Sequence, residues 1–324
     1  MLRIHFTAQD LIRTTLATEP DPLWEVLLSL HLLQDSGAEL VYGKWRRQVT
    51  QPAPRQHLRR LVELAPARGY SPDFLTPAKA HDNLDEALDT LVSTERTTVL
   101  NQVDYLMTRR PATAWTKALA TGESGAMKQL GADVRAYHDT AIAPYWPSIR
   151  RQVNADRAIR VESMVHHGVE HLLANLHPRV RWQAPVLQIL DFVDTDVYLD
   201  GRGLRLQPSF FCWQAPTKLR DGNLPPVLVF PTRPAPGELH QGETRTAGSL
   251  AALLGRTRAE ALAVIGNGKT TSEVAQLCKV SLPAASQQTA VLRGAGLITT
   301  RRTGTAVLHE LTTLGEDLLN GTGT

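Results

Sequence analysis

A stretch of low apolar content interrupts this chain of 324 residues. Residues 233–248 are rich in Pro, Gly, Glu and Thr, and they offer few side chains that a hydrophobic core could bury. This composition is typical of linkers. A chain of this length also exceeds the size at which one core is usual. The sequence therefore predicts separate folding units on either side of residues 233–248, the second of them a domain at residues 249–324.

Residues 1–178 follow the pattern of separate helices. Apolar side chains recur at spacings of three and four, as at Leu23, Val26, Leu27, Leu30 and Leu33. Prolines divide the region, and the longest uninterrupted segment extends from residue 146 to about residue 176, before Pro178. We therefore predict a helical domain over residues 1–178.

Residues 179–232 change to β-branched and aromatic residues broken by turn signals. We predict a small antiparallel sheet packed on the helical domain, with strands near residues 186–190, 197–199, 204–211 and 227–230. The run Asp200-Gly201-Arg202-Gly203 is expected to form a hairpin turn. The expected fold class is therefore mainly α with a small antiparallel β region.

Aromatic side chains gather in the same region, and two interpretations of them stay open. They could line a pocket for a small-molecule effector, or they could form the core of the sheet. The pocket hypothesis names Trp182, Tyr198, Phe211 and Trp213.

Composition limits the remaining function classes. The formal net charge is only +3, so an affinity for nucleic acid must come from local placement of Lys and Arg. Cys212 and Cys278 lie far apart, which argues against a disulfide framework or a thiolate zinc site. The first residues lack the apolar run of a signal peptide. We expect a cytoplasmic protein without a cofactor.

Residues 249–324 contain the signals of three helices. Thr257 and Glu260 have capping-box spacing before the first, which ends at residues 266–268. A short second helix begins near Thr271, and Ser281 is placed to cap a third after a short turn. Two helices joined by about four residues fit the helix-turn-helix pattern.

The third helix and the segment after it supply candidate DNA contacts. Ala285, Thr289 and Leu292 fall on the face that must pack, which leaves the N-terminal half of the helix outward. Residues 297–311 then read as a strand, a basic tip and a return strand, whose tip can reach the phosphate backbone. The predicted DNA-binding residues are Lys279, Ser281, Ala284, Ser286, Gln287, Gln288, Arg293, Arg301, Arg302 and Thr303. Ser286 and Gln287 are expected to read bases, while Lys279, Arg301 and Arg302 hold phosphates.

Local charge supports this hypothesis. Residues 249–309 contain seven basic side chains against two acidic ones, Glu260 and Glu273, an excess of five positive charges. The basic residues are Arg256, Arg258, Lys269, Lys279, Arg293, Arg301 and Arg302.

The same segment resembles the winged helix-turn-helix of the arsenical-resistance-repressor (ArsR) family of bacterial regulators. The resemblance rests on Leu254-Gly255-Arg256-Thr257-Arg258, Thr271-Ser272-Glu273-Val274-Ala275, residues 281–292, and Arg293-Gly294-Ala295-Gly296-Leu297-Ile298 followed by the Arg-Arg-x-Gly wing. It covers under a quarter of the chain. The upstream region is similar to the extra N-terminal domain of long actinobacterial members, in His177-Pro178-x-Val180-Arg181-Trp182, in residues 199–204 and in Pro208-Ser209-Phe210-Phe211-Cys212-Trp213.

The resemblance implies a homodimer. We expect a sequence-specific regulator of transcription, a repressor rather than an activator, and each protomer would enter one major groove of double-stranded DNA, so that the binding site is an imperfect palindrome. The helix before Gly266 and the last helix, residues 314–319, would form the dimer interface. Two departures limit what carries over. Thr270-Thr271-Ser272 stands where the metal sensors of the family have Cys-Val-Cys, so we expect no metal there. Leu282-Pro283 stands where many members have Gln-Ser, so those base contacts do not transfer.

Two alternatives come from other function classes. A winged helix sometimes serves only as a protein-interaction module, so a scaffold without DNA affinity stays open. His167-x-x-Glu170-His171 has the spacing of one class of zinc hydrolase, although a solvated helix face explains it equally well and no third ligand is identifiable. We expect a regulator and not an enzyme.

Overall fold

The structure, a computed structural model, describes residues 1–50, 55–79, 81, 83–123, 125–232, 239, 250–251, 253–266, 268–303 and 306–320. It is about 55% helical with 14% strand, which agrees with the prediction of a mainly α protein. The chain divides into two compact units, Met1–Leu239 and His240–Thr324. The linker predicted at residues 233–248 falls, apart from Leu239, on residues outside the described part.

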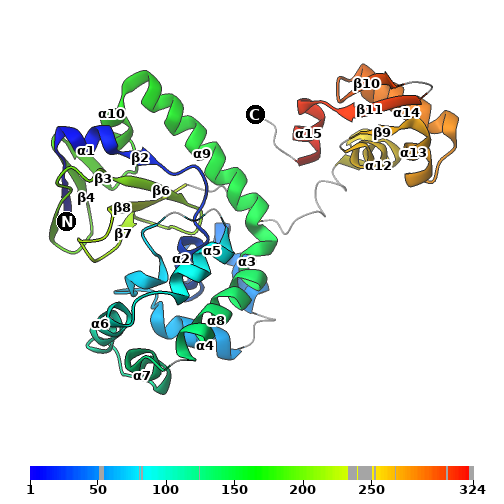
Figure 1. The fold of residues 1–324 in the computed structure, drawn as a ribbon. Helices are drawn as coiled ribbons and strands as arrows, with labels where there is room; N and C mark the ends of the chain where they lie inside the picture. Colours follow the sequence, from blue (N-terminus) through cyan, green and yellow to red (C-terminus); the bar gives the residue numbers. More distant parts are fainter. Residues whose placement is uncertain are drawn as a thin grey trace. The chain divides into compact units, whose positions relative to one another are not determined.

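Most of the first unit consists of helices that end at prolines and polar turns (Figure 1). They are α2 (Pro22–Leu33), α3 (Glu39–Thr50), α4 (Arg55–Leu64), α5 (Leu84–Val92), α6 (Arg96–Met107), α7 (Ala114–Thr121), α8 (Ala126–Ala141) and α9 (Trp146–His167). Side-chain caps fix the starts of α2, α5 and α7. For example, the Asp21 carboxylate accepts hydrogen bonds from the backbone N–H groups of Leu23 and Trp24, which caps α2.

The long helix α9 is shorter than the sequence predicts. It stops at His167 because Gly168 adopts a φ of 84°, and a separate helix, α10 (Val169–Ala174), follows. Glycine occupies such a left-handed conformation without steric cost, so it ends helices readily. Residues 169–174 are helical as predicted, but the single helix predicted up to about residue 176 is wrong, because it is interrupted at Gly168.

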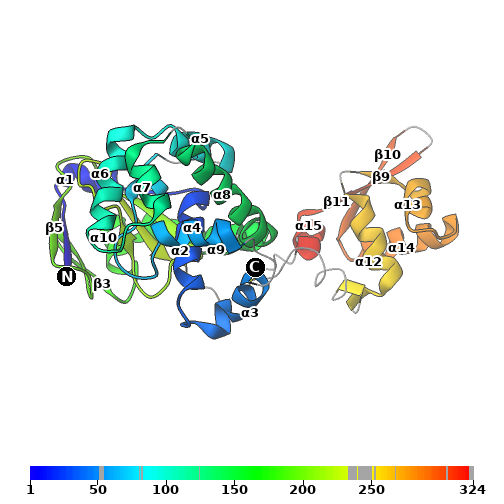
Figure 2. The ribbon, with the colours of Figure 1, turned by 90° about the horizontal axis from the view of Figure 1, so that it is seen from below.

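The strands of the first unit form two four-stranded sheets. The first sheet has the order β3 (Val180–Gln183), β4 (Val186–Ile189), β1 (Leu2–His5) and β5 (Thr195–Tyr198). The second sheet has the order β2 (Thr15–Leu16), β6 (Arg205–Ser209), β8 (Val227–Pro231) and β7 (Thr217–Lys218). Both views place the first sheet at the side of the unit away from α3 (Figures 1 and 2).

These sheets correct the prediction in two respects. Both are mixed rather than antiparallel, because β1 pairs in parallel with β5, and β6 pairs in parallel with β2 and β8. In addition, residues 1–178 are not wholly helical and residues 179–232 do not form a sheet alone, because β1 lies between β4 and β5. Leu2 and Ile4 alternate with half-buried polar residues and are buried there, as a strand with one covered face requires.

Strand β8 separates the two hydrophobic cores of the unit. Its side chains alternate, so that Val227 and Val229 belong to the core of the helices, while Leu228 and Phe230 belong to the core between the sheets and α10. Every residue of β8 is buried. A strand covered on both faces needs a continuous apolar run, which residues 227–230 provide.

Residues 200–203, where a hairpin turn is predicted, instead form the loop that connects the first sheet to the second. Strands β5 and β6, on either side of it, belong to different sheets. Helix α1 (Ala8–Arg13) packs against the turn: the buried Asp10 carboxylate accepts the Gly203 N–H at 2.8 Å, and a Cβ at Gly203 would lie 2.5 Å from the Arg13 carbonyl oxygen. This close approach redirects the chain, so the hairpin prediction is wrong.

A buried carboxylate joins the helices to the second sheet. Glu25 of α2 accepts hydrogen bonds from Ser209 Oγ at 3.0 Å and from the backbone N–H groups of Phe210 and Phe211 at 2.9 and 3.0 Å. Burial nevertheless raises the pKa of Glu25 to about 7, because it is removed from water. The Tyr42 hydroxyl donates to the Phe210 carbonyl at 2.7 Å and fixes the same loop.

This carboxylate predicts a pH-dependent stability of the first unit. The pKa of Glu25 in the folded protein lies above its value in the unfolded chain. Its contribution to the free energy of unfolding is therefore greatest below about pH 4.5 and is lost as pH rises through 7. Glu25→Gln removes this titration. The unfolding free energy of the wild type minus that of the variant should therefore fall by on the order of 3 kcal/mol between pH 4.5 and 8. Tryptophan fluorescence during denaturant unfolding measures it, because all six tryptophans lie in the first unit; a difference that does not change with pH would contradict the assignment.

The second unit has its own small core. Its elements are α12 (Arg256–Ile265), β9 (Lys269–Thr270), α13 (Thr271–Leu277), α14 (Leu282–Gly294), β10 (Ile298–Thr303), β11 (Ala306–Leu311) and α15 (Thr313–Asn320). Strands β10 and β11 form an antiparallel hairpin that β9 extends, and the hairpin projects beside α13 (Figure 2). The core is aliphatic, with Leu262, Ile265, Val274 and Leu292 at its centre.

Candidate nucleic-acid interface

Helices α13 and α14 are fixed by hydrogen bonds at their starts. Thr270 and Glu273 form a capping box on α13, with the Thr270 N–H donating to Glu273 Oε2 at 2.7 Å. Ser281 caps α14, as predicted, by accepting the Ala284 N–H. The capping box predicted at Thr257 is wrong, because α12 begins at Arg256, and Glu260 instead pairs with Arg256 at 3.1 Å.

Helix α14 presents an exposed ridge of small residues. Ala285, Thr289 and Leu292 are buried, as the spacing predicts, so the opposite face is open to solvent. At its centre lie Pro283, Gln287, Ala290 and Gly294, all exposed and spaced at four, three and four residues. Ser286 is exposed beside this ridge. Gln287 is thus the one long side chain in this row, and the other three residues have side chains that extend little from the helix backbone.

Two of the predicted DNA-binding residues of α14 lie off this ridge. Ala284 is half-buried, and Gln288 is half-buried with its Oε1 accepting from Arg258 Nε of α12 at 3.0 Å. Gln288 therefore ties α14 to α12 rather than facing outward. Sequence reasoning could not foresee this contact because Arg258 and Gln288 are thirty residues apart.

Positive charge lies at both ends of α14. Lys279, in the turn before the helix, is exposed and adopts a φ of 54°, and Arg293 is exposed in the last turn. Neither takes part in an ion pair among the residues that the structure describes. Arg301 of β10 is exposed and meets Glu310 of β11 at 3.3 Å. The side chains of Arg302 and Thr303 lie outside the described part of the chain.

Two large apolar side chains flank the turn between α13 and α14. Leu277 at the end of α13 is 53% exposed, and Leu282 at the start of α14 is 52% exposed. Neither leucine is among the predicted DNA-binding residues, although Leu282-Pro283 departs from the sequence that many members of the similar family have at this place. An exposed leucine at the first turn of α14 stands where a DNA-binding helix contacts bases.

A buried histidine connects α13 to the hairpin. His309 of β11 has Nε2 within 2.9 Å of Thr271 Oγ1 and Nδ1 within 3.1 Å of Thr300 Oγ1, so it joins three elements. Burial, with a smaller effect of the Arg293 charge, lowers the pKa of His309 below its usual range. The neutral ring is therefore the form that the fold accepts.

Acidification should loosen the second unit through this histidine. Because the folded pKa of His309 is depressed, the unfolded chain takes up the proton first, and stability is lost as pH falls below about 6.5. Relative to His309→Gln, the wild type should lose amide hydrogen-exchange protection in α12, α13 and α14 between pH 7.5 and 5.5. Mass spectrometry of peptides from this unit measures the loss, with exchange rates corrected for the intrinsic effect of pH. Equal losses in both proteins would contradict the role of His309.

The aromatic residues of the predicted effector pocket are not brought together. Phe211 is buried in the core of the helices, and Trp213 packs against that core. Trp182 packs against the other core and contacts Phe6 edge to face. Tyr198 is exposed and stacks on His5 with ring centroids 4.4 Å apart. The core interpretation describes Phe211 and Trp182 better than a shared pocket does.

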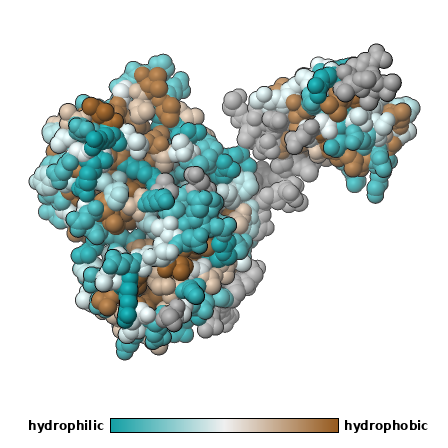
Figure 3. Space-filling view, in the orientation of Figure 1, coloured by the Kyte–Doolittle hydropathy of each residue, from teal (hydrophilic) through white to brown (hydrophobic). Residues whose placement is uncertain are grey.

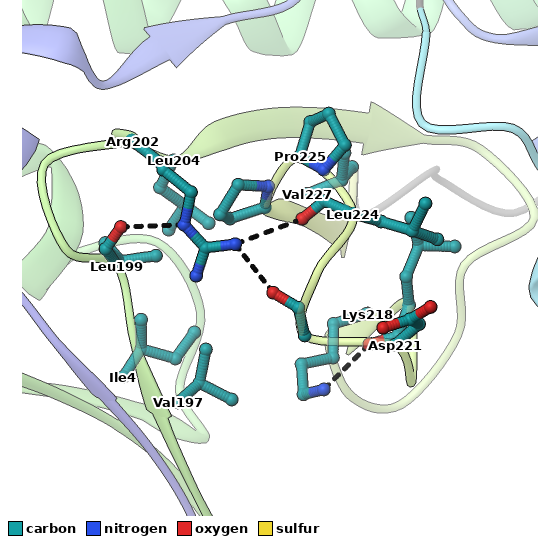
Figure 4. A pocket seen from close by; sticks show the side chains of 13 residues that line it. Ile4, Val197, Leu199, Arg202, Leu204, Lys218, Asp221, Leu224, Pro225 and Val227 are labelled. Carbon is teal, nitrogen blue, oxygen red and sulfur yellow. Dashed lines mark hydrogen bonds between the residues drawn. The ribbon is translucent and has the colours of Figure 1, made fainter.

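A cavity does occur nearby, between the turn after β5 and the loop before β8 (Figure 4). Its volume is about 20 Å³, room for about one water molecule. Arg202 extends across it and donates to the carbonyl oxygens of Leu199 at 2.9 Å and Gly222 at 2.6 Å (Figure 4). Arg202 thus holds two loops together, and the cavity is far smaller than the pockets that bind drug-sized ligands.

The histidines of the zinc-hydrolase motif lie on either side of the helix break. His167 ends α9 and His171 lies in α10, with ring centroids 4.7 Å apart. The Glu170 carboxylate, which would have to activate water in a zinc hydrolase, instead accepts a hydrogen bond from the Trp182 indole N–H at 2.8 Å. Among the described residues, no group of three or more His, Cys, Asp or Glu side chains could hold a metal ion.

Within the described part of the chain, no helix combines the length and the apolar character needed to cross a lipid bilayer. Comparisons with models of known families, with curated proteins and with solved structures found no match to this chain.

Proposed function

We propose that the second unit binds double-stranded DNA as a winged helix-turn-helix and that the chain is a dimeric transcriptional regulator, a repressor of the kind that the ArsR resemblance implies. The observation that carries the proposal is the ridge of α14, whose residues are small apart from Gln287. Lys279 and Arg293, at the two ends of the helix, form no ion pair with any residue that the structure describes. The order of three helices followed by a hairpin agrees with this class of DNA-binding domain.

The dimensions of α14 suit the major groove. Its 13 residues give a length of about 20 Å, more than the groove width of about 12 Å. Lys279 and Arg293 would then face phosphates on the two sides of the groove, while the ridge faces the base edges. Small residues at 283, 290 and 294 let the helix backbone come close to the bases.

The side chains divide into positioning and reading roles. Gln287 has the amide that pairs with adenine, and Ser286 can reach a base or a phosphate. Lys279, Arg293, Arg301 and Arg302 would hold phosphates. The exposed ion pair of Arg301 with Glu310 is no obstacle, because such pairs contribute little in water.

Two further features favour duplex DNA. Residues 240–324 contain no Phe, Tyr or Trp, so the unit lacks the aromatic platforms on which proteins stack single-stranded bases. Leu282 offers an apolar contact at the first turn of α14, where a thymine methyl group is the matching feature of the major groove. A dimer would place two such helices one helical turn apart and therefore recognise an imperfect palindrome.

Charge reversal and amide removal should separate the two roles. On a duplex selected from a random pool, Arg301→Glu/Arg302→Glu should weaken binding to all sequences and flatten the salt dependence. Gln287→Ala should cost about 1–3 kcal/mol on the selected duplex and little on unrelated ones. Arg59→Glu/Arg68→Glu, which reverses the same amount of charge at two exposed arginines of the first unit, and Gln183→Ala, at an exposed glutamine of β3, are the matched controls.

Mobility-shift titration at two salt concentrations reads out all of these variants. Wild-type protein without DNA affinity would leave the protein-interaction scaffold as the better hypothesis. DNA binding that neither set of substitutions changes would instead keep the regulator but refute the docking through α14 and the hairpin.

The apolar contact of Leu282 has its own test. In the selected duplex, thymine→uracil replacement removes only the methyl group, and one position in each half-site should lose affinity about threefold to tenfold. The loss should disappear in Leu282→Ala, since the variant has no side chain to make the contact. If every such replacement has the same effect on both proteins, Leu282 does not contact a thymine.

A further inference from the structure

Helix α9 exposes large apolar side chains to solvent. Its inner side is covered, with Ile149 and Val153 in the helical core and Arg160 stacked over Phe230 of β8. On its outer side, Ile159 is 69% exposed and Val165 is 73% exposed. Apolar surface is visible at the end of the unit where α9 gives way to α10 (Figure 3). Single exposed apolar residues are ordinary. Ile159 and Val165 are six residues apart and lie on different sides of the exposed surface of the helix, so the residues between them decide whether that surface is a contact site.

The charges of α9 are arranged unequally on its two sides. Arg160 pairs with Asp156 at 2.5 Å, and both are largely buried, while Arg150 pairs with Glu19 at 3.0 Å. Arg151 and Glu162 lie on the outer side. Arg151 donates to Ser148 Oγ at 2.9 Å, and neither of the two has an ion-pair partner among the described residues.

These two charges belong to one stripe along the helix. Arg151, Ala155, Ala158 and Glu162 are exposed and spaced at four, three and four residues, so they share one face. The stripe thus has a positive end, two small residues at its centre and a negative end. Ile159 and Val165 flank it on opposite sides.

We propose that this face of α9 pairs antiparallel with the same face of a second copy of this chain. An antiparallel register that places Arg151 opposite Glu162 of the second copy also places Ala155 opposite Ala158 of the second copy. The stripe is therefore complementary to itself, which is the condition for a two-fold symmetric interface. Small residues at the centre allow the two helices to approach closely, and Ile159 and Val165 add apolar contact at the flanks.

This interface lies in the first unit and does not depend on DNA binding. It is separate from the contact through the last helix that the family resemblance implies. A second copy is favoured over an unrelated partner because the two charges on the stripe match each other across a two-fold axis, so no other protein is needed to neutralise them.

Exchange of charge tests the interface with the full-length protein. Arg151→Glu alone and Glu162→Arg alone each turn two attractive pairs into two repulsive ones, so self-association should weaken by about tenfold. An equimolar mixture of the two variants restores both pairs and should associate like the wild type. Sedimentation equilibrium measures the association, and tryptophan fluorescence checks that each variant is folded. Single variants that associate like the wild type, or a mixture that associates no better than either one, would overturn the pairing.

Disulfide cross-linking between cysteines on α9 reports on this interface alone, even if the chain also associates through another surface. In a Cys278→Ser background, Ala155→Cys and Ala158→Cys proteins should cross-link to each other on mild oxidation faster than either does with itself, because only the mixed pair lies face to face. Ile159→Asp should slow this cross-linking, whereas Ile12→Asp, at an 84% exposed position of α1, should not. Cross-linking at equal rates in the mixed and unmixed samples would refute the register.

Discussion

The arrangement of the first unit depends on the hydrogen bonds that Glu25 accepts from residues 209–211. These residues leave the second sheet at the end of β6 and enter the core of the helices, where Phe210 and Phe211 are buried. Their backbone N–H groups would otherwise be unsatisfied in an apolar interior, which is costly. Glu25 thus allows one loop to join a sheet to a helical core, and β8 can then be covered by apolar side chains on both faces.

Local features of the fold could be predicted from the sequence. Ser281 caps α14 because a serine at the N-cap accepts a backbone N–H wherever the next residues form a helix. The buried set of Ala285, Thr289 and Leu292 follows from helical spacing, and the β8 strand follows from its apolar run. In each case the physical cause lies within a few residues of its effect.

Features that depend on distant residues could not be predicted in this way. Leu2, Ile4 and Phe6 alternate with polar residues, but the prediction of a helical domain over residues 1–178 missed this strand, and nothing local indicates that β1 lies between β4 and β5. The same holds for Gln288, whose outward position on a helical wheel is overruled by Arg258. At residues 200–203 the glycines signal a turn correctly, while the contact with α1 decides that the turn leads to another sheet.

The central position of β1 has a consequence for synthesis on the ribosome. Its partners are residues 186–189 and 195–198, so the first sheet cannot close until almost two hundred residues after β1 have been made. Contacts so remote in sequence form slowly, and the helices between them can assemble earlier from local interactions. Strand β1 therefore stays unpaired, with the side chains of Leu2 and Ile4 uncovered, until its partner strands have been translated, and a chaperone that binds this segment would act during that interval.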